Sequence, residues 1–300
     1  MNLIWIERKD VEADYWQQKL EQADCSCMMA QPWYLDAVSD GHWAILTNET
    51  HSLWMPVAYQ KKWGFEYTFM PPHTQQLGIM GQKADDYAVV IFLDALQHRF
   101  KWIDYKMPFH KQLLATSPFN LTKLNFVFPL PINKQLFKKS TFNNIKRLQK
   151  SQLKFQKGNI NHVVSYFSET KGKQVGWSAV QEKAILNIAN EGQKRGQIEV
   201  WEAINLANQP IAGIVIGYWK DTVYFIFSGQ IDEGRKSGAV TGLFLHAWDI
   251  SQNGYYFFDC LGSEDSGLKN FYEAFGGKPS NYLHLRINHL PFPVRLLKHF

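Results

Sequence analysis

The stretch TVYFIFSGQIDEGRKSGAVTGLFLHAWDISQNGYYFFD, residues 222–259, decides the fold of this 300-residue chain. Its first seven residues are apolar, β-branched and aromatic, which predicts a buried strand. A polar loop is expected next, followed by an amphipathic helix whose 3.6-residue period is carried by Val240, Leu243, Phe244, Ala247 and Ile250. A second apolar run over residues 255–259 predicts another strand. The stretch therefore forms a strand, a loop, a helix and a strand.

The loop before this helix consists of Arg235, Lys236, Ser237, Gly238 and Ala239. Small residues there allow a ligand to approach the backbone, and the unpaired N–H groups and dipole of a helix start attract an anion. The two basic side chains add positive charge. The pattern indicates either a phosphate-binding or pyrophosphate-binding loop or an ordinary helix start with solvated basic residues.

Three motifs in this part of the chain resemble those of a known family. The loop R-K-S-G-A resembles the degenerate R/Q-x-x-G-x-G/A acyl-CoA pyrophosphate loop of the GNAT N-acyltransferases, with Ala239 in place of the last glycine. The segments F-D-C-L-G-S and G-L-K-N-F-Y-E-A-F-G-G, which follow it, resemble the signature of the FemABX-like branch. The resemblance covers most of residues 140–285. One departure is Tyr272, where Fem transferases often carry lysine.

The resemblance implies an α/β fold of two tandem GNAT-like domains, each a mixed sheet flanked by helices. Members of the FemABX-like branch transfer an aminoacyl or acyl group to an amine. The resemblance implies acyl-CoA as co-substrate and no metal. The expected cofactor-binding residues are Phe227 and Ser228, at the end of the first strand, and Arg235, Lys236, Ser237, Gly238 and Ala239.

The order of expected elements is similar in the two halves of the chain, which indicates domains at 1–133 and 134–300. Each half contains a three-stranded meander, then a helix and further strands. In the first half, Pro71–Gly78 stands where the phosphate-binding loop should be, and it carries no Arg or Lys. We expect that domain to be degenerate for the cofactor and to help bind the acceptor.

Two residues are candidates for proton transfer. Asp259 ends the second strand and could take a proton from the amine, or it could cap a neighbouring loop. Tyr272 stands where many CoA-dependent GNAT enzymes place the tyrosine that protonates the leaving thiolate, although its position on an apolar helix stripe also suits a core aromatic. Ser263 and Glu264 are candidates for acceptor contacts, or they form a solvated turn.

A basic segment precedes the second domain: residues 134–157 carry eight Lys or Arg and no acid. Lys146, Arg147 and Lys150 lie in its expected helix and are predicted to bind a phosphate-bearing acceptor. The alternative is a solvated helix face. Because aromatic residues are sparse here, the segment does not resemble a single-strand nucleic-acid platform, and no DNA partner is expected.

Composition narrows the class of protein further. The N-terminus lacks the pattern of a secretory signal, and the longest apolar run, Tyr87–Leu96, is too short to span a bilayer. Three cysteines make neither a disulfide framework nor a four-ligand zinc site, and no His pair has metal-ligand spacing. We therefore expect a cytoplasmic protein without a membrane span or a metal.

The function expected from the sequence is acyl-CoA-dependent transfer of an acyl group to an amine on a small molecule, a peptide or a cell-envelope precursor. One alternative is a Fem-type transferase that uses aminoacyl-tRNA. The lysine replaced by Tyr272, and the absence of room for a coiled-coil arm between Glu182 and Arg195, weigh against tRNA. The other alternative is a binding protein that kept the fold without catalysis.

Overall fold

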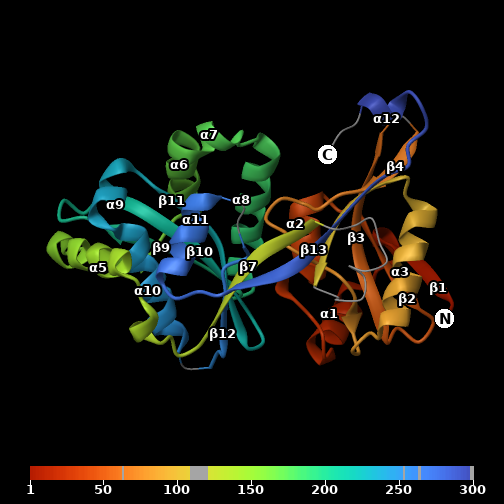
Figure 1. Ribbon diagram of the computed structural model, residues 1–300, viewed down its shortest axis with the longest axis horizontal. Helices are drawn as coiled ribbons and strands as arrows, with labels where there is room; N and C mark the ends of the chain where they lie inside the picture. The colour runs from red at the N-terminus through yellow and green to blue at the C-terminus, as the bar shows by residue number, and fades with distance from the viewer. Residues whose placement is uncertain (63, 109–120, 253, 263–264, 298–300) are drawn as a thin grey trace. The chain divides into compact units, whose positions relative to one another are not determined.

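The computed structural model describes residues 1–62, 64–108, 121–252, 254–262 and 265–297 (Figure 1). The chain forms two compact units. Unit 1 comprises Met1–Lys123 together with Asn281–Phe300, and unit 2 comprises Leu124–Ser280. No helix in the described residues is long and apolar enough to cross a membrane.

Unit 1 is built from a meander of strands with helices between and beside them. Its strands are β1 (Leu3–Glu7), β2 (Trp43–Asn48), β3 (Leu53–Lys62), β4 (Phe65–Thr68), β5 (Met80–Gly81) and β6 (Trp102–Pro108). Its helices are η1 (Arg8–Asp10), α1 (Ala13–Gln22), η2 (Met28–Ala30), α2 (Pro32–Ser39), α3 (Asp86–Arg99) and α12 (Val294–Leu297). Two further strands, β7 (Leu121–Pro129) and β13 (Pro279–Asn288), run from one unit's part of the chain into the other's.

Unit 2 repeats this plan. Its strands are β8 (Lys154–Lys157), β9 (Ile198–Ile204), β10 (Pro210–Trp219), β11 (Thr222–Gln230) and β12 (Phe257–Asp259). Its helices are η3 (Lys134–Leu136), α5 (Lys139–Ser151), α6 (Ile160–Phe167), the π-helical turn η4 (Ser168–Gly172), α7 (Lys173–Val175), α8 (Ala179–Lys194), α9 (Asp232–Ser237), α10 (Ala239–Ser251) and α11 (Ser266–Ala274).

The two units share one strand layout, which confirms the expected mixed α/β fold. In unit 1 the antiparallel meander β2-β3-β4 is followed by α3 and by β6, which pairs with β4 in parallel. In unit 2 the antiparallel meander β9-β10-β11 is followed by α10 and by β12, which pairs with β11 in parallel. Strands that pair in parallel need a long crossover connection, and a helix supplies it in both units.

The last strand of each repeat is exchanged. β7 follows β6 in the sequence but pairs antiparallel with β12 of unit 2. β13 follows β12 in the sequence but pairs antiparallel with β6 of unit 1. The compact units therefore differ from the two contiguous halves expected at residue 133, because the C-terminal strand returns to the first unit.

The core of unit 2 is organised around the apolar face of α10. Phe244 is fully buried and contacts aromatic rings on neighbouring elements, among them Phe258 on β12 at 5.2 Å and Phe271 on α11 at 5.2 Å between ring centroids. Aromatic pairs at such distances add to the stability that burial of apolar area provides. This packing fixes α10 and α11 against the sheet and positions the ends of β11 and β12.

Candidate functional site

A cavity of about 820 Å³ lies in unit 2 beside the half of β11 that β12 does not pair. The two strands pair only from Thr222–Phe257 to Tyr224–Asp259, whereas β11 continues to Gln230. Four residues of this unpaired half line the cavity: Phe225, Ser228, Gly229 and Gln230. The strand therefore presents its edge to the cavity, where a ligand with amide groups could pair with it as an added strand would.

A β-bulge aims the side chains of β11. Val215 on β10 lies opposite Phe227, and the next residue, Ile216, lies opposite Phe225, so Ile226 is an extra residue. In a regular strand, residues three apart point to opposite faces; the bulge places both Phe225 and Ser228 in the cavity wall. Phe227, predicted to bind the cofactor, packs instead against Phe167 and stacks on Trp177 at 5.4 Å.

The prediction of a loop before α10 is wrong, because most of the segment expected to bind phosphate is helical. Arg235, Lys236 and Ser237 form the end of helix α9, and Gly238 joins it to α10 in a left-handed conformation with φ of 76°. A Cβ atom on Gly238 would lie 3.0 Å from the carbonyl oxygen of Asn144 on α5. Glycine is therefore required here for backbone conformation and for the packing of α5. Ala239 is fully buried in the core.

The start of α10 still borders the cavity, together with two arginines. Gly238, Val240 and Thr241 line it, as do Arg235 from α9 and Arg147 from α5. The first N–H groups of a helix have no partner within the helix, so this end attracts anions. Arg147, predicted to bind the acceptor, thus lies at the same end of the same cavity as Arg235.

The charges of the cavity wall are balanced, because three acids face three cations. Arg235 pairs with Asp232 at 2.5 Å, and Lys171 pairs with Asp265 at 2.7 Å. The hydrogen bond from Lys171 holds the pKa of Asp265 below its usual range. Arg147 forms no ion pair with any described residue, so its charge is available to a ligand.

The remaining basic candidates point elsewhere. Lys236 is exposed, pairs with Asp232 at 2.7 Å and lines a separate groove with Ser237. Lys146 and Lys150 are exposed on α5 and do not line the cavity. Ser263 and Glu264, predicted to contact the acceptor, lie outside the described residues.

Asp259 is buried and does not line the cavity. Its Oδ1 accepts hydrogen bonds from the backbone N–H of Leu261 at 2.8 Å and from the side-chain amide of Asn125 at 3.1 Å. Burial raises the pKa of Asp259 to about 6, although these two donors lower it in part. The carboxylate caps a neighbouring loop, which is the structural alternative foreseen for it.

Tyr272 packs in the aromatic core. It is 2% exposed and lies 5.4 Å from Phe126 and 6.1 Å from Phe244 between ring centroids. Burial raises the pKa of its hydroxyl well above the usual value. Its neighbour Phe271 lines the cavity, whereas Tyr272 does not. The placement favours the core role over the acid role, which stays a prediction.

The corresponding gap in unit 1 is filled by the chain itself. β4 and β6 pair only at Tyr67–Trp102 and Thr68–Ile103, and the segment that follows β4 then runs along β6. The N–H of Leu77 donates to the carbonyl of Lys106, and the N–H of Gly78 donates to the hydroxyl of Tyr105. The N–H groups of Leu77 and Gly78 and the carbonyl of Lys106 are thus already hydrogen-bonded within the chain.

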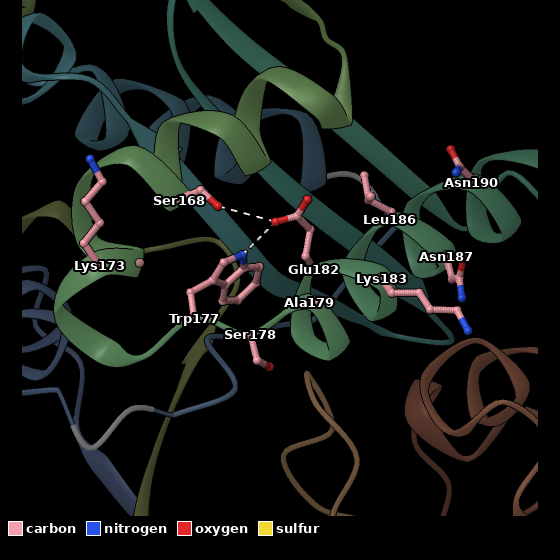
Figure 2. Close-up of a pocket in the computed structure, with 11 residues that line it drawn as sticks. Ser168, Lys173, Trp177, Ser178, Ala179, Glu182, Lys183, Leu186, Asn187 and Asn190 are labelled. Carbon is pink, nitrogen blue, oxygen red and sulfur yellow. Dashed lines mark hydrogen bonds between the residues drawn. The ribbon is translucent and has the colours of Figure 1, made fainter.

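A second cavity, of about 670 Å³, lies on the other side of the π-helical turn η4 (Figure 2). Thr170 and Lys171 of this turn line the first cavity, whereas Ser168 and Gly172 line the second. In Figure 2 the carboxylate of Glu182 accepts hydrogen bonds from Trp177 Nε1 at 3.2 Å and Ser168 Oγ at 3.5 Å. Within the described residues, no cluster of His, Cys, Asp and Glu could hold a metal ion.

Sequence reasoning missed several parts of the site. The bulge at Ile226 leaves no mark on the apolar pattern, since every nearby residue suits a strand. The lining residues of η4, such as Thr170 and Lys171, come from a turn that shows only helical periodicity in the sequence. Phe271 could have been found, because it precedes Tyr272 in the quoted motif.

Replacing Asp259 by asparagine tests its structural role. The raised pKa means that the folded protein holds this proton more tightly than the unfolded chain, so ionisation destabilises the fold as pH rises through about 6. Asp259→Asn keeps an acceptor for Leu261 N–H and removes that cost. Urea unfolding should show a variant more stable by up to about 3 kcal/mol at pH 8, with a smaller gain near pH 4.5. A gain that is largest at low pH would contradict this.

No protein-family model matches the sequence, and no curated protein matches it significantly. Solved structures do match. FemX has a TM-score of 0.69 at 11% identity, with 99% of each chain covered. The L-PGS structure from Bacillus licheniformis has a TM-score of 0.57 at 12% identity, with 95% of each chain covered.

A tandem GNAT protein from the clavulanic acid biosynthesis pathway has a TM-score of 0.53 at 7% identity, and the match covers 97% of this chain and 99% of that one. These likenesses extend over almost the whole of each chain, so both units and their order are shared. At such low identities these likenesses establish the fold alone, and any chemistry has to be argued from the residues of the site. The chain has the tandem GNAT fold of the FemX type.

Proposed function

We propose that this protein transfers an acyl group from a phosphate-bearing donor, acyl-CoA in the first instance, to a primary amine. The observation that carries the proposal is the cavity along the unpaired half of β11. Unit 2 binds the donor, and unit 1, whose own gap is filled, serves the acceptor.

The cavity suits such a donor in its volume and in the charged, polar and apolar groups that line it. Its volume of about 820 Å³ falls within the roughly 300–1,000 Å³ that ligand pockets usually have. Arg147 and the start of α10 form a cationic end for phosphates. The strand edge next to Gly229 suits an arm with amide groups, and Phe225 and Phe271 form an apolar wall for an acyl chain.

Transfer requires an uncharged amine placed against an activated carbonyl, which a bound thioester supplies. The residues of the chain position the reactants, and positioning alone can supply much of the rate. Backbone N–H groups on the edge of β11 that β12 does not pair would stabilise charge on the carbonyl oxygen of a donor bound along that edge. Asp259 lies one strand away as a base that could act only through intervening groups.

Aminoacyl-tRNA is the second candidate donor. The helix α5 borders the cavity through Arg147, and its exposed Lys146 and Lys150 continue the positive charge along the surface. A polyanion could follow this track into the cavity. The third reading, a binding protein without catalysis, keeps the cavity but predicts no amide product when donor and amine are mixed.

Arg147→Gln tests the donor site, with Lys146→Gln as a matched control on the same helix. Arg147 lines the cavity and Lys146 does not. Loss of one charge-assisted hydrogen bond should weaken acetyl-CoA binding about 10- to 100-fold in calorimetry, whereas Lys146→Gln should leave the affinity unchanged. Equal affinities of wild type and Arg147→Gln for acetyl-CoA would show that the donor does not bind in this cavity. A loss of affinity in Lys146→Gln alone would indicate that the donor binds along the exposed surface of α5.

Tyr272→Phe decides between the core and acid roles of this tyrosine. The ring packing is kept and only the hydroxyl is lost. Because Tyr272 does not line the cavity, we expect kcat to change by less than about threefold, against the roughly 10²- to 10⁴-fold that general acid catalysis supplies. A hundredfold fall in kcat with unchanged stability would restore Tyr272 as the acid for the leaving thiolate.

A further inference from the structure

One ion pair spans the gap between the two strands that separate in unit 2. β11 and β12 stop pairing after Tyr224–Asp259, and the chain that follows β12 leads into α11. Asp265 is the N-cap residue of α11, and its Oδ2 lies 2.7 Å from Nζ of Lys171 in the π-helical turn η4. Both side chains line the cavity along β11, called the donor cavity below.

The turn η4 belongs to the β11 side of this gap. It directly continues α6, and α6 packs so closely on β11 that a Cβ atom on Gly229 would clash with the carbonyl oxygen of Val163. The hydroxyl oxygen of Thr170 in η4 also lies 3.4 Å from the carbonyl oxygen of Gln230, the last residue of β11. The Lys171–Asp265 pair therefore joins an element that is fixed on β11 to one that follows β12.

The pair is suited to opening and closing. The side chains of Lys171 and Asp265 are 38% and 33% exposed, and ion pairs with this much solvent contact contribute little to stability. The start of α11 does not depend on the pair, because Oδ1 of Asp265 separately accepts a hydrogen bond from the N–H of Leu268 at 2.9 Å. Single π-helical turns within helices are also frequent at functional sites. The pair can therefore break while both elements stay folded.

We propose that the Lys171–Asp265 pair is a latch, which opens when the donor enters or leaves the cavity and closes over the bound donor. The inference rests on the proposed function, because it takes the donor to lie along the unpaired edge of β11. A donor held there lies between the two elements that the pair joins. A pair that forms equally in the free and the donor-bound protein leaves the affinity unchanged, but it slows both entry and release.

Surface plasmon resonance on the immobilised full chain, with acetyl-CoA as the probe, tests the latch. Lys171→Gln removes the cation, and Asp265→Asn removes the anion while keeping a capping oxygen for α11. Because no pair then has to break before the donor passes, both kon and koff should rise about two- to fivefold in each variant, with Kd unchanged. The double variant should match either single variant, since the same pair is broken only once.

Lys173→Gln is the matched control. Lys173 is the next lysine in the sequence, is exposed, and lines the second cavity and not the donor cavity (Figure 2). Unchanged rates in this variant exclude a general effect of lost charge on an anionic donor. Weaker affinity confined to Lys171→Gln would overturn the latch, because Lys171 would then contact the donor directly. Rates equal to those of wild type in both Lys171→Gln and Asp265→Asn would overturn it as well.

Hydrogen exchange in the ligand-free proteins separates the latch from the proposed function. Exchange over residues 168–172 and 268–270 should be faster in Lys171→Gln and Asp265→Asn than in wild type and Lys173→Gln. Equal exchange in all of them would show that the pair does not hold η4 and α11 together, and would overturn the latch without touching the donor site. Faster exchange with no binding of acetyl-CoA to any of these proteins would contradict the proposed donor, and the latch with it.

Discussion

The separation of β11 from β12 is the constraint on which the site depends. Three residue pairs hold these parallel strands together, and β11 then continues for six more residues beside a cavity. A strand edge inside a folded unit is costly to leave without partners, because each buried backbone group needs a hydrogen bond. The packing of α10 and α11 around Phe244 offsets that cost and keeps the cavity open. The bulge at Ile226 places the side chains of Phe225 and Ser228 in the cavity wall.

The two units share one strand layout, so the open cavity of unit 2 depends on its particular sequence and not on the fold. Both units contain a parallel strand pair that ends after two or three residue pairs. In unit 1 the segment with Leu77 and Gly78 occupies the gap and uses its backbone donors on β6. One fold thus yields an open cleft in one unit and a closed one in the other.

Periodicity in the sequence predicted the helices, the meanders and the repeated order well, because each element buries one face or one stripe. The helix α10 and the strand β11 follow directly from that rule. The exchange of β7 and β13 could not be predicted, since a strand's partner depends on packing far along the chain and not on its own residues. The motif around Gly238 does border the cavity, but the glycine is needed for contact with α5, and Arg147, predicted to bind the acceptor, lines the same cavity.

Hydrogen exchange measured with and without acetyl-CoA tests the central claim most directly, because it reads the backbone of the strand edge. The account predicts slower exchange over residues 225–230 and 238–241 when the donor is present, with no change over residues 74–78 in unit 1, where the backbone is already bonded. Protection confined to residues 74–78, or no protection along β11 at saturating acetyl-CoA, would contradict it.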